Sequence, residues 1–151
     1  MPKYVCARCR GSFTLTAKED NLIHREMELF CSPDCLLDMI DRRGFQPGIA
    51  TVPRPTFMTR PVNGTRSMNE SVVLIFMEQR NVTVLYEPFA IRLERGDRYV
   101  PDLFLPEYNV VIEIKGAWAW RGKTKVLRVK EQLGEQRFYL MPDYLCRTLM
   151  R

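Results

Sequence analysis

The sequence of 151 residues lacks any apolar run close to the ~20 residues that cross a bilayer, and no apolar signal-peptide segment follows Met1. We therefore expect a cytoplasmic protein with no membrane partner. Internal repeats and low-complexity segments are missing too. The chain is too short for two full domains, because 46% hydrophobic residues supply one ordinary core plus a small appendage.

An excess of acidic charge is also missing. Lys and Arg total 23 against 18 Asp and Glu, which gives a formal net charge of +5 and a pI near 9.1. Such a balance favours partners that carry negative charge, of which nucleic acid is the commonest. A merely basic protein would have the same modest excess, so the charge alone does not identify the partner.

Histidine is nearly absent, since His24 is the only one, whereas cysteine occurs five times. Cys146 stands alone, and the other four cysteines form two close pairs. In a reducing compartment such pairs favour a metal over disulfides, and four thiolates complete the tetrahedral shell of zinc. A closed shell leaves no position for a substrate, so we predict a structural Zn²⁺ site. Its ligands are Cys6, Cys9, Cys31 and Cys35.

Two questions about this module stay open. His24 is an alternative ligand, although a packing or surface role fits it better because four sulfurs suffice. The second cysteine pair precedes a helix-like run at 36–40, an arrangement that resembles treble-clef zinc fingers. Basic residues edge the module, so it either contacts DNA phosphates or only supports the fold.

Proline divides the chain. A proline- and glycine-rich segment at 46–66 excludes a helix or central strand and predicts a linker between a zinc module at 1–45 and a core at 67–151. In the core, apolar spacing predicts helices, strands and turns in the order α, several β, α, β, α, which indicates an α/β fold. The expected helices are 68–80, 123–133 and 143–150, and the expected strands are 82–86, 89–93, 99–105, 110–115 and 137–141.

Charged side chains interrupt two of these strands. Asp102 follows Pro101 in the first, and Glu113 and Lys115 lie two positions apart in the second, so both emerge on one face. Phosphodiester hydrolysis needs a hard cation that polarises the phosphate and activates water, and Mg²⁺ prefers a few carboxylates with water. We predict that Asp102 and Glu113 bind Mg²⁺ and that Lys115 orients or deprotonates the attacking water.

Each assignment has an alternative. A turn would also explain Asp102, and an exposed strand face would explain Glu113 with Lys115. Catalysis is favoured for the three residues, because charged groups in an apolar strand are costly. Glu70, near the start of a helix, would complete the acidic cluster, but a capping box begun by Ser67 explains it without chemistry. Glu87 is a weaker candidate that either supports the site or is a plain surface charge.

Two segments carry a resemblance to a known family. Residues 99–106 (YVPDLFLP) and 111–118 (VIEIKGAW) match the PD-(D/E)xK nuclease motif and resemble the phage endonuclease I type of Holliday junction resolvase over roughly residues 67–151. The resemblance implies a restriction-endonuclease-like core with a central mixed sheet flanked by helices, a homodimer, and paired nicks in four-way DNA junctions with Mg²⁺ or Mn²⁺. The family's helix glutamate, strand aspartate, strand glutamate and lysine fall on Glu70, Asp102, Glu113 and Lys115.

The zinc module departs from that family and leaves the substrate open. Branched DNA is the leading substrate; a sequence- or end-specific endonuclease and a non-catalytic DNA-binding zinc protein are the alternatives. A phage or a bacterium would suit such an enzyme. Aromatic and basic residues after the motif suit stacking on bases and neutralising phosphates, or else form a packed tryptophan and a solvated helix. The predicted DNA-binding residues are Trp118, Trp120, Arg121, Lys123, Lys125 and Arg128.

Overall fold

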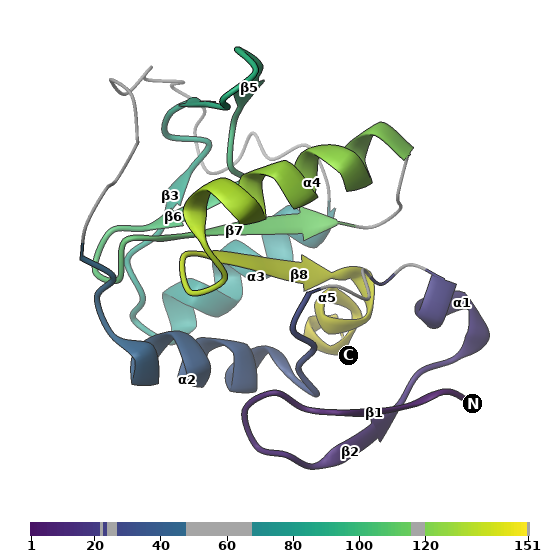
Figure 1. Cartoon of the computed structure of the whole chain (residues 1–151). Coiled ribbons are helices and arrows are strands. Elements are labelled where there is room, and N and C mark those ends of the chain that lie inside the picture. The colour runs from purple at the N-terminus through teal and green to yellow at the C-terminus, as the bar shows by residue number, and fades with distance from the viewer. Residues whose placement is uncertain (22, 24–26, 48–67, 116–119, 151) are drawn as a thin grey trace.

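The computed structural model describes residues 1–21, 23, 27–47, 68–115 and 120–150, with side chains of the last range described from residue 124 onward. Its helices and strands follow the order predicted for the second part of the chain (Figure 1). The helices are α1 (Ala17–Asn21), α2 (Pro33–Arg43), α3 (Met68–Gln79), α4 (Trp120–Leu133) and α5 (Asp143–Leu149). The strands are β1 (Lys3–Val5), β2 (Ser12–Thr14), β3 (Leu85–Tyr86), β4 (Ile91–Arg92), β5 (Arg98–Tyr99), β6 (Leu103–Leu105), β7 (Val110–Lys115) and β8 (Phe138–Pro142).

A four-stranded mixed sheet forms the centre of the fold, with strands in the order β3-β6-β7-β8. The first two pairings are antiparallel, and β7 pairs with β8 in parallel. Parallel neighbours need a crossover connection, which α4 supplies between β7 and β8. The expected buried central strand is confirmed, since β7 lies between two partners and only Lys115 at its end is partly exposed.

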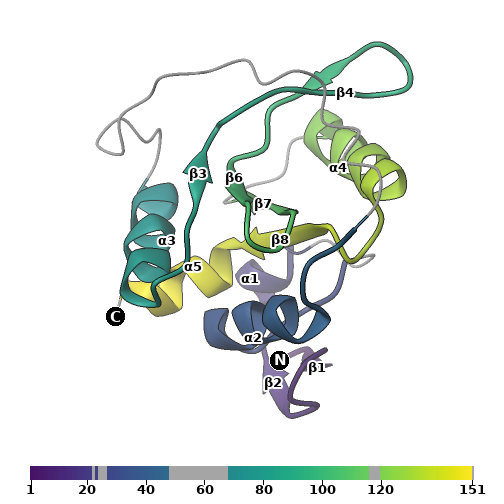
Figure 2. The same ribbon diagram turned by 90° about the vertical axis from the view of Figure 1, so that its left-hand side faces the viewer.

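Helices cover both faces of this sheet (Figures 1 and 2). Side chains alternate along β7, so Val111 packs toward α4 while Ile112 and Ile114 pack toward α3 and α5. From α4, Val126 and Val129 close the first of these two clusters. The expected α/β fold with a mixed sheet flanked by helices is therefore confirmed.

The cysteine-rich segment packs on the same core. Phe30 is 1% exposed, and its backbone amide and carbonyl both bond the buried Tyr144 hydroxyl of α5, which donates to the carbonyl and accepts from the amide. The ring of Phe13 stacks on Tyr144 with centroids 5.9 Å apart. Arg80 at the end of α3 forms a bidentate pair with Asp34 of α2 at 2.9 and 3.1 Å. The first 45 residues thus share one hydrophobic cluster with α3, β7 and α5.

Three expected strands are wrong in extent. The strand expected at 89–93 is shortened to β4. The strand expected at 82–86 is shortened to β3, because the Val82 amide still donates to Met77 of α3 at 3.0 Å. The strand expected at 99–105 is divided into β5 and β6. Pro101 has no amide hydrogen to donate to a neighbouring strand. The Ile114 amide of β7 donates to the Asp102 carboxylate at 2.7 Å and not to a backbone carbonyl of β6. This break is what turns the Asp102 carboxylate toward β7.

Candidate functional site

The four paired cysteines lie together. Cys6 and Cys9 occupy the loop between β1 and β2, Cys31 precedes α2, and Cys35 lies in its first turn. The Cys31 sulfur is 3.7 Å from that of Cys9 and 3.6 Å from that of Cys35, and all four sulfurs lie within 4.8 Å of one another. The predicted ligand set is therefore brought together, whereas Cys146 is buried elsewhere in α5.

Local backbone structure directs the four sulfurs toward one another. Ser32 caps α2, and its hydroxyl accepts the Cys35 amide at 3.1 Å, which fixes the helix start between the last two cysteines. In the first loop Arg10 has a φ of 65°, and the Gly11 amide donates to the Cys9 sulfur at 3.4 Å. A Cβ at Gly11 would lie 3.3 Å from that sulfur, so a larger residue would crowd it.

The electrostatics of the four thiols show why they suit a cation. Burial and hydrogen bonds with the other thiols raise the pKa of Cys31 to about 12. Burial also raises the pKa of Cys6, but backbone hydrogen bonds outweigh it and lower that pKa to about 6. Four thiols so close cannot all ionise unless a positive charge joins them, and a soft divalent ion supplies it.

A second cluster is made of carboxyl groups. Glu70 of α3, Glu87 after β3 and Asp102 before β6 each offer an oxygen, and these oxygens lie within 4.8 Å of one another. Glu70 and Glu87 are 8% and 3% exposed. The pairing of β3 with β6 brings Glu87 close to Asp102, since the Glu87 amide donates to the Asp102 carbonyl at 2.9 Å.

Asp102 also joins this cluster to β7. Its carboxylate accepts the Ile114 amide at 2.7 Å and forms a side-chain hydrogen bond with Glu113. The Lys115 ammonium lies 3.8 Å from the Glu113 carboxylate and is 30% exposed. Asp102 therefore lies between a Glu70–Glu87 side and a Glu113–Lys115 side of one continuous acidic site.

Two buried tyrosines hold the outer carboxylates. The Tyr86 hydroxyl donates to Glu70, and the Tyr99 hydroxyl donates to Glu113. Both rings are at most 9% exposed, so each hydroxyl has a fixed direction. A hydrogen bond of this kind orients one carboxylate oxygen and leaves the other available to a second partner.

Burial of the carboxyl groups changes their titration. Burial, followed by the charge of Asp102, raises the pKa of Glu113 well above its ordinary value. Burial likewise raises the pKa of Asp102, although hydrogen bonds from Glu113 and Ile114 oppose it. Without a cation, the folded protein therefore retains a proton on this pair at pH values where the unfolded chain has lost it.

We predict that this proton makes stability depend on pH in the direction opposite to that of most carboxylates. The folded pKa of Glu113 is raised, so stability is full below the unfolded value near 4.5 and falls as pH rises toward the folded pKa. In that window each such group contributes a slope of up to about 1.4 kcal/mol per pH unit. Urea unfolding without Mg²⁺ should show the decline, and Glu113→Gln should flatten it. An equal slope in both proteins would contradict the assignment.

The structure brings together Glu70, Asp102, Glu113 and Lys115, all four residues predicted for the acidic site. The predicted DNA-binding strip is only partly described: Trp118 and His24 lie outside the described residues, as do the side chains of Trp120, Arg121 and Lys123. Lys125 is half-buried on α4. Arg128 pairs with Asp97 at 2.8 Å.

Sequence reasoning ranked Glu87 too low and missed the roles of Tyr86 and Tyr99. The signal for Glu87 was its place directly after a strand and before Pro88, where the chain turns; its φ is 45°. For the tyrosines, the available signal was a hydroxyl on an otherwise apolar strand, which seeks a partner when buried.

No family model, no curated protein and no solved structure matches the chain. Among the described residues, no helix combines the length and the apolar character needed to cross a membrane.

Proposed function

We propose that this protein is a metal-dependent, structure-selective DNA endonuclease that nicks branched DNA such as a four-way junction. The observation that carries the proposal is the convergence of Glu70, Asp102, Glu113 and Lys115 from one helix and two neighbouring strands. The residue types match those that a phosphodiester hydrolase needs, and the central mixed sheet between helices suits the restriction-endonuclease-like core that the motif implies.

The donor set fits Mg²⁺ or Mn²⁺. All the groups are carboxylate oxygens, which hard divalent cations prefer, and Asp102 lies where it can serve both sides of the site. Burial and the charge of Asp102 raise the pKa of Glu113, so a cation bound there would favour the ionised carboxylates. When bound there, the cation would polarise the scissile phosphate and lower the pKa of an attacking water.

The protein groups then have distinct tasks. Asp102, with Glu70 and Glu87 on one side and Glu113 on the other, would hold the cation, and the two tyrosine hydroxyls keep Glu70 and Glu113 in place. Lys115, partly exposed beside Glu113, would orient the attacking water and offset negative charge that develops on the phosphate. The leaving 3′ or 5′ oxygen would take its proton from solvent, since the Lys115 side chain beside it is 30% exposed.

We further propose that the four-cysteine cluster holds a structural Zn²⁺. Its four sulfurs would fill a tetrahedral shell, and its neighbours pack into the core rather than lining an open site. Paired nicking of a junction calls for two active sites related by a two-fold axis, hence a homodimer. Met68 and Ile75, seven residues apart on one face of α3, are 68% and 54% exposed and support self-association.

The second candidate function is an endonuclease specific for a sequence or a DNA end, whose zinc module contacts duplex DNA. The third candidate function is DNA binding without catalysis. The complete set of carboxylates with Lys115 favours the two enzymes, because buried acids without a task are costly to keep.

One assay separates these functions. The full chain is incubated with Mg²⁺ and either a four-way junction or a linear duplex of matched sequence, beside Asp102→Asn. Paired symmetric nicks in the junction, lost in the variant, are the expected result. Cutting of the linear duplex at fixed positions would support the sequence- or end-specific enzyme, and cutting of neither DNA would overturn the nuclease proposal.

A further inference from the structure

A hairpin of β4 and β5 projects from the end of the molecule opposite the zinc module (Figures 1 and 2). The two strands pair antiparallel with Ile91 opposite Tyr99 and Arg92 opposite Arg98. Ile91 and Tyr99 point inward, are 0% and 5% exposed, and pack in the same cluster as Val129 of α4. Because side chains alternate along a strand, the two arginines point outward.

This outward pair is unfavourable for the isolated fold. Like charges directly opposite each other on paired strands destabilise the pairing. Both arginines are exposed, and among the described residues neither has an ion-pair partner. Asp97 in the turn is instead engaged by Arg128 of α4 at 2.8 Å. The repulsion between Arg92 and Arg98 in the free protein would become an attraction for an anion bound between them.

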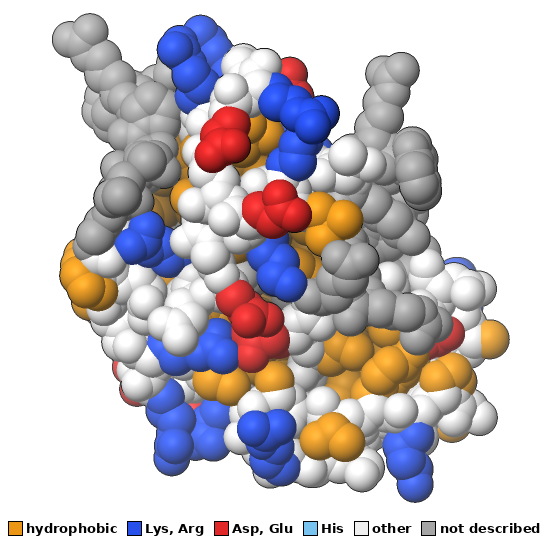
Figure 3. All heavy atoms as spheres, viewed as in Figure 1, with side chains coloured by type: hydrophobic (Ala, Val, Ile, Leu, Met, Phe, Trp, Pro, Cys, Tyr) orange, Lys and Arg blue, Asp and Glu red, His pale blue; other side chains and the backbone are white. Residues whose placement is uncertain are grey.

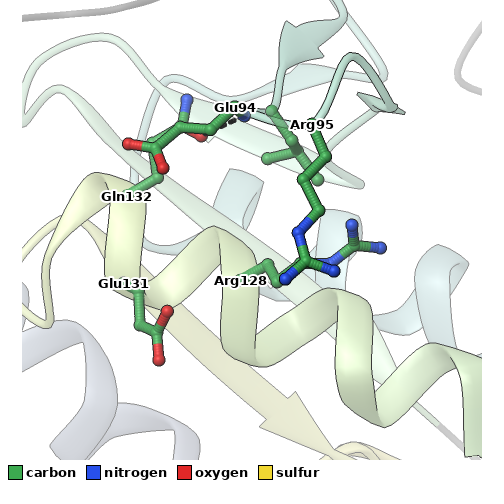
Figure 4. A pocket seen from close by; sticks show the side chains of 6 residues that line it. Glu94, Arg95, Arg128, Glu131 and Gln132 are labelled. Atoms are coloured by element: carbon green, nitrogen blue, oxygen red, sulfur yellow. Dashed lines mark hydrogen bonds between the residues drawn. The ribbon is translucent and has the colours of Figure 1, made fainter.

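The hairpin is held rigidly against α4. The Gln132 side-chain amide donates to the Arg92 carbonyl at 2.9 Å and accepts the Glu94 amide at 3.2 Å. In Figure 4, Arg95 extends from the turn so that its guanidinium lies beside Arg128, which increases the positive charge at this end. Figure 3 shows several Lys and Arg side chains gathered at the same end of the surface, with acidic groups between them.

The same hairpin is fixed relative to the acidic site. Tyr99 ends β5, and its hydroxyl donates to Glu113. Arg98 precedes Asp102 by four residues, which even in a fully extended chain span at most about 14 Å. At about 3.4 Å of rise per base pair along one strand, that distance corresponds to roughly four base pairs. The outward arginines are therefore placed to reach phosphates close to the bond that would be cut.

We propose that residues 91–99 form a DNA-backbone clamp, in which Arg92 and Arg98, with Arg95 at the turn, bind phosphates of the duplex arm that enters the acidic site. This inference rests on the proposed function, since it takes DNA as the substrate. It assigns binding to residues other than those of the strip that follows the motif, and the two sets adjoin at Arg128. The chemistry is that of guanidinium groups on backbone phosphates, which gives affinity without sequence preference.

The test measures binding of a fluorescent four-way junction to the full chain by anisotropy, with Ca²⁺ in place of Mg²⁺, at several salt concentrations. Each lost phosphate contact on B-DNA reduces the slope of log affinity against log salt by about 0.9, so Arg92→Gln/Arg98→Gln should reduce it by about 1.8. At 0.1 M salt the affinity should fall on the order of tenfold or more. Arg92→Lys/Arg98→Lys, which keeps the charge, should restore most of the slope.

Two controls make the result specific. Arg10→Gln/Arg42→Gln removes the same charge from exposed positions in the zinc module and α2, and should change the slope much less. The hairpin variant should keep its melting temperature, because a like-charge pair has been removed. An unchanged salt slope in the hairpin variant overturns the clamp while leaving the nuclease proposal intact. Failure of the wild-type chain to bind or cut any DNA overturns both.

Discussion

Cys31→Ser is expected to destabilise the whole chain and not merely the four-cysteine module. Structural zinc contributes about 10–16 kcal/mol in small zinc-finger peptides, which is comparable with the about 5–15 kcal/mol that stabilises a typical domain. Even a loss of about 5 kcal/mol would lower the melting temperature of a chain of this size by roughly 10–20 °C. The effect should therefore be among the largest that a single substitution produces here.

The destabilisation should reach the core because Cys31 directly follows Phe30. That residue is buried, and its backbone is bonded to Tyr144 of α5 through both its amide and its carbonyl. When the metal no longer fixes Cys31, the Phe30 loop loses its anchor, and the Tyr144 hydroxyl is left buried without those bonds. Removal of such a partner costs about 1–3 kcal/mol in addition to the lost metal.

The measurements are elemental analysis for zinc and thermal unfolding by circular dichroism. The wild-type chain should contain one zinc per molecule, and Cys31→Ser should contain little. Cys146→Ala is the control, since it removes a thiol that lies outside the cluster, and it should retain the full metal content. A Cys31→Ser protein with unchanged stability would show that the cluster is not a structural metal site.

The sequence predicted those parts of the fold whose signal is local. β7 was identifiable because an apolar β-branched run with a proline- and asparagine-containing turn before it suits a buried central strand. Glu113 and Lys115 were identifiable for the related reason that charged groups are rare in such a run. The capping signal near Met68 likewise predicted the start of α3.

Features that depend on pairing between distant segments were not predictable. Glu87 carries no periodic signal, and it joins the acidic site only because β3 pairs with β6 and brings its amide to the Asp102 carbonyl. Tyr86 and Tyr99 read as ordinary strand residues, and the direction of their hydroxyls follows from packing against α3 and β7. The short strands β1 and β2 have three residues each, too few for a periodic pattern to identify.

The buried carboxyl groups of the acidic site and a bound cation would stabilise one another. Burial raises the pKa of both Glu113 and Asp102, and the charge of Asp102 raises that of Glu113 further, which is unfavourable at neutral pH in the absence of a cation. The Tyr99 hydrogen bond and Lys115 reduce that cost only in part. A strained arrangement of this kind is typical of sites that are completed by a ligand, because the ligand supplies the missing charge.

Glu113→Gln should abolish nicking, with a loss of at least about 10³-fold, because one substitution removes a cation ligand and the charge that favours the cation. The amide nearly matches the carboxyl group in shape, and at neutral pH it replaces a buried acid with a neutral group. The variant should therefore fold and stay at least as stable as the parent without metal. Glu78→Gln on the exposed surface of α3 is the matched control and should cut normally.

Lys115→Met distinguishes metal binding from the chemical step. Lys115 is cationic and opposes a bound cation, so its loss should leave the affinity for Mn²⁺ unchanged or higher while nicking falls by about 10²-fold or more. Glu113→Gln should instead weaken Mn²⁺ binding in isothermal titration. Because only Glu113→Gln is predicted to weaken metal binding while both variants lose activity, a general folding defect cannot produce the pattern. Parallel losses of Mn²⁺ binding, or cutting by Glu113→Gln at the wild-type rate, would contradict the roles assigned to these two residues of β7.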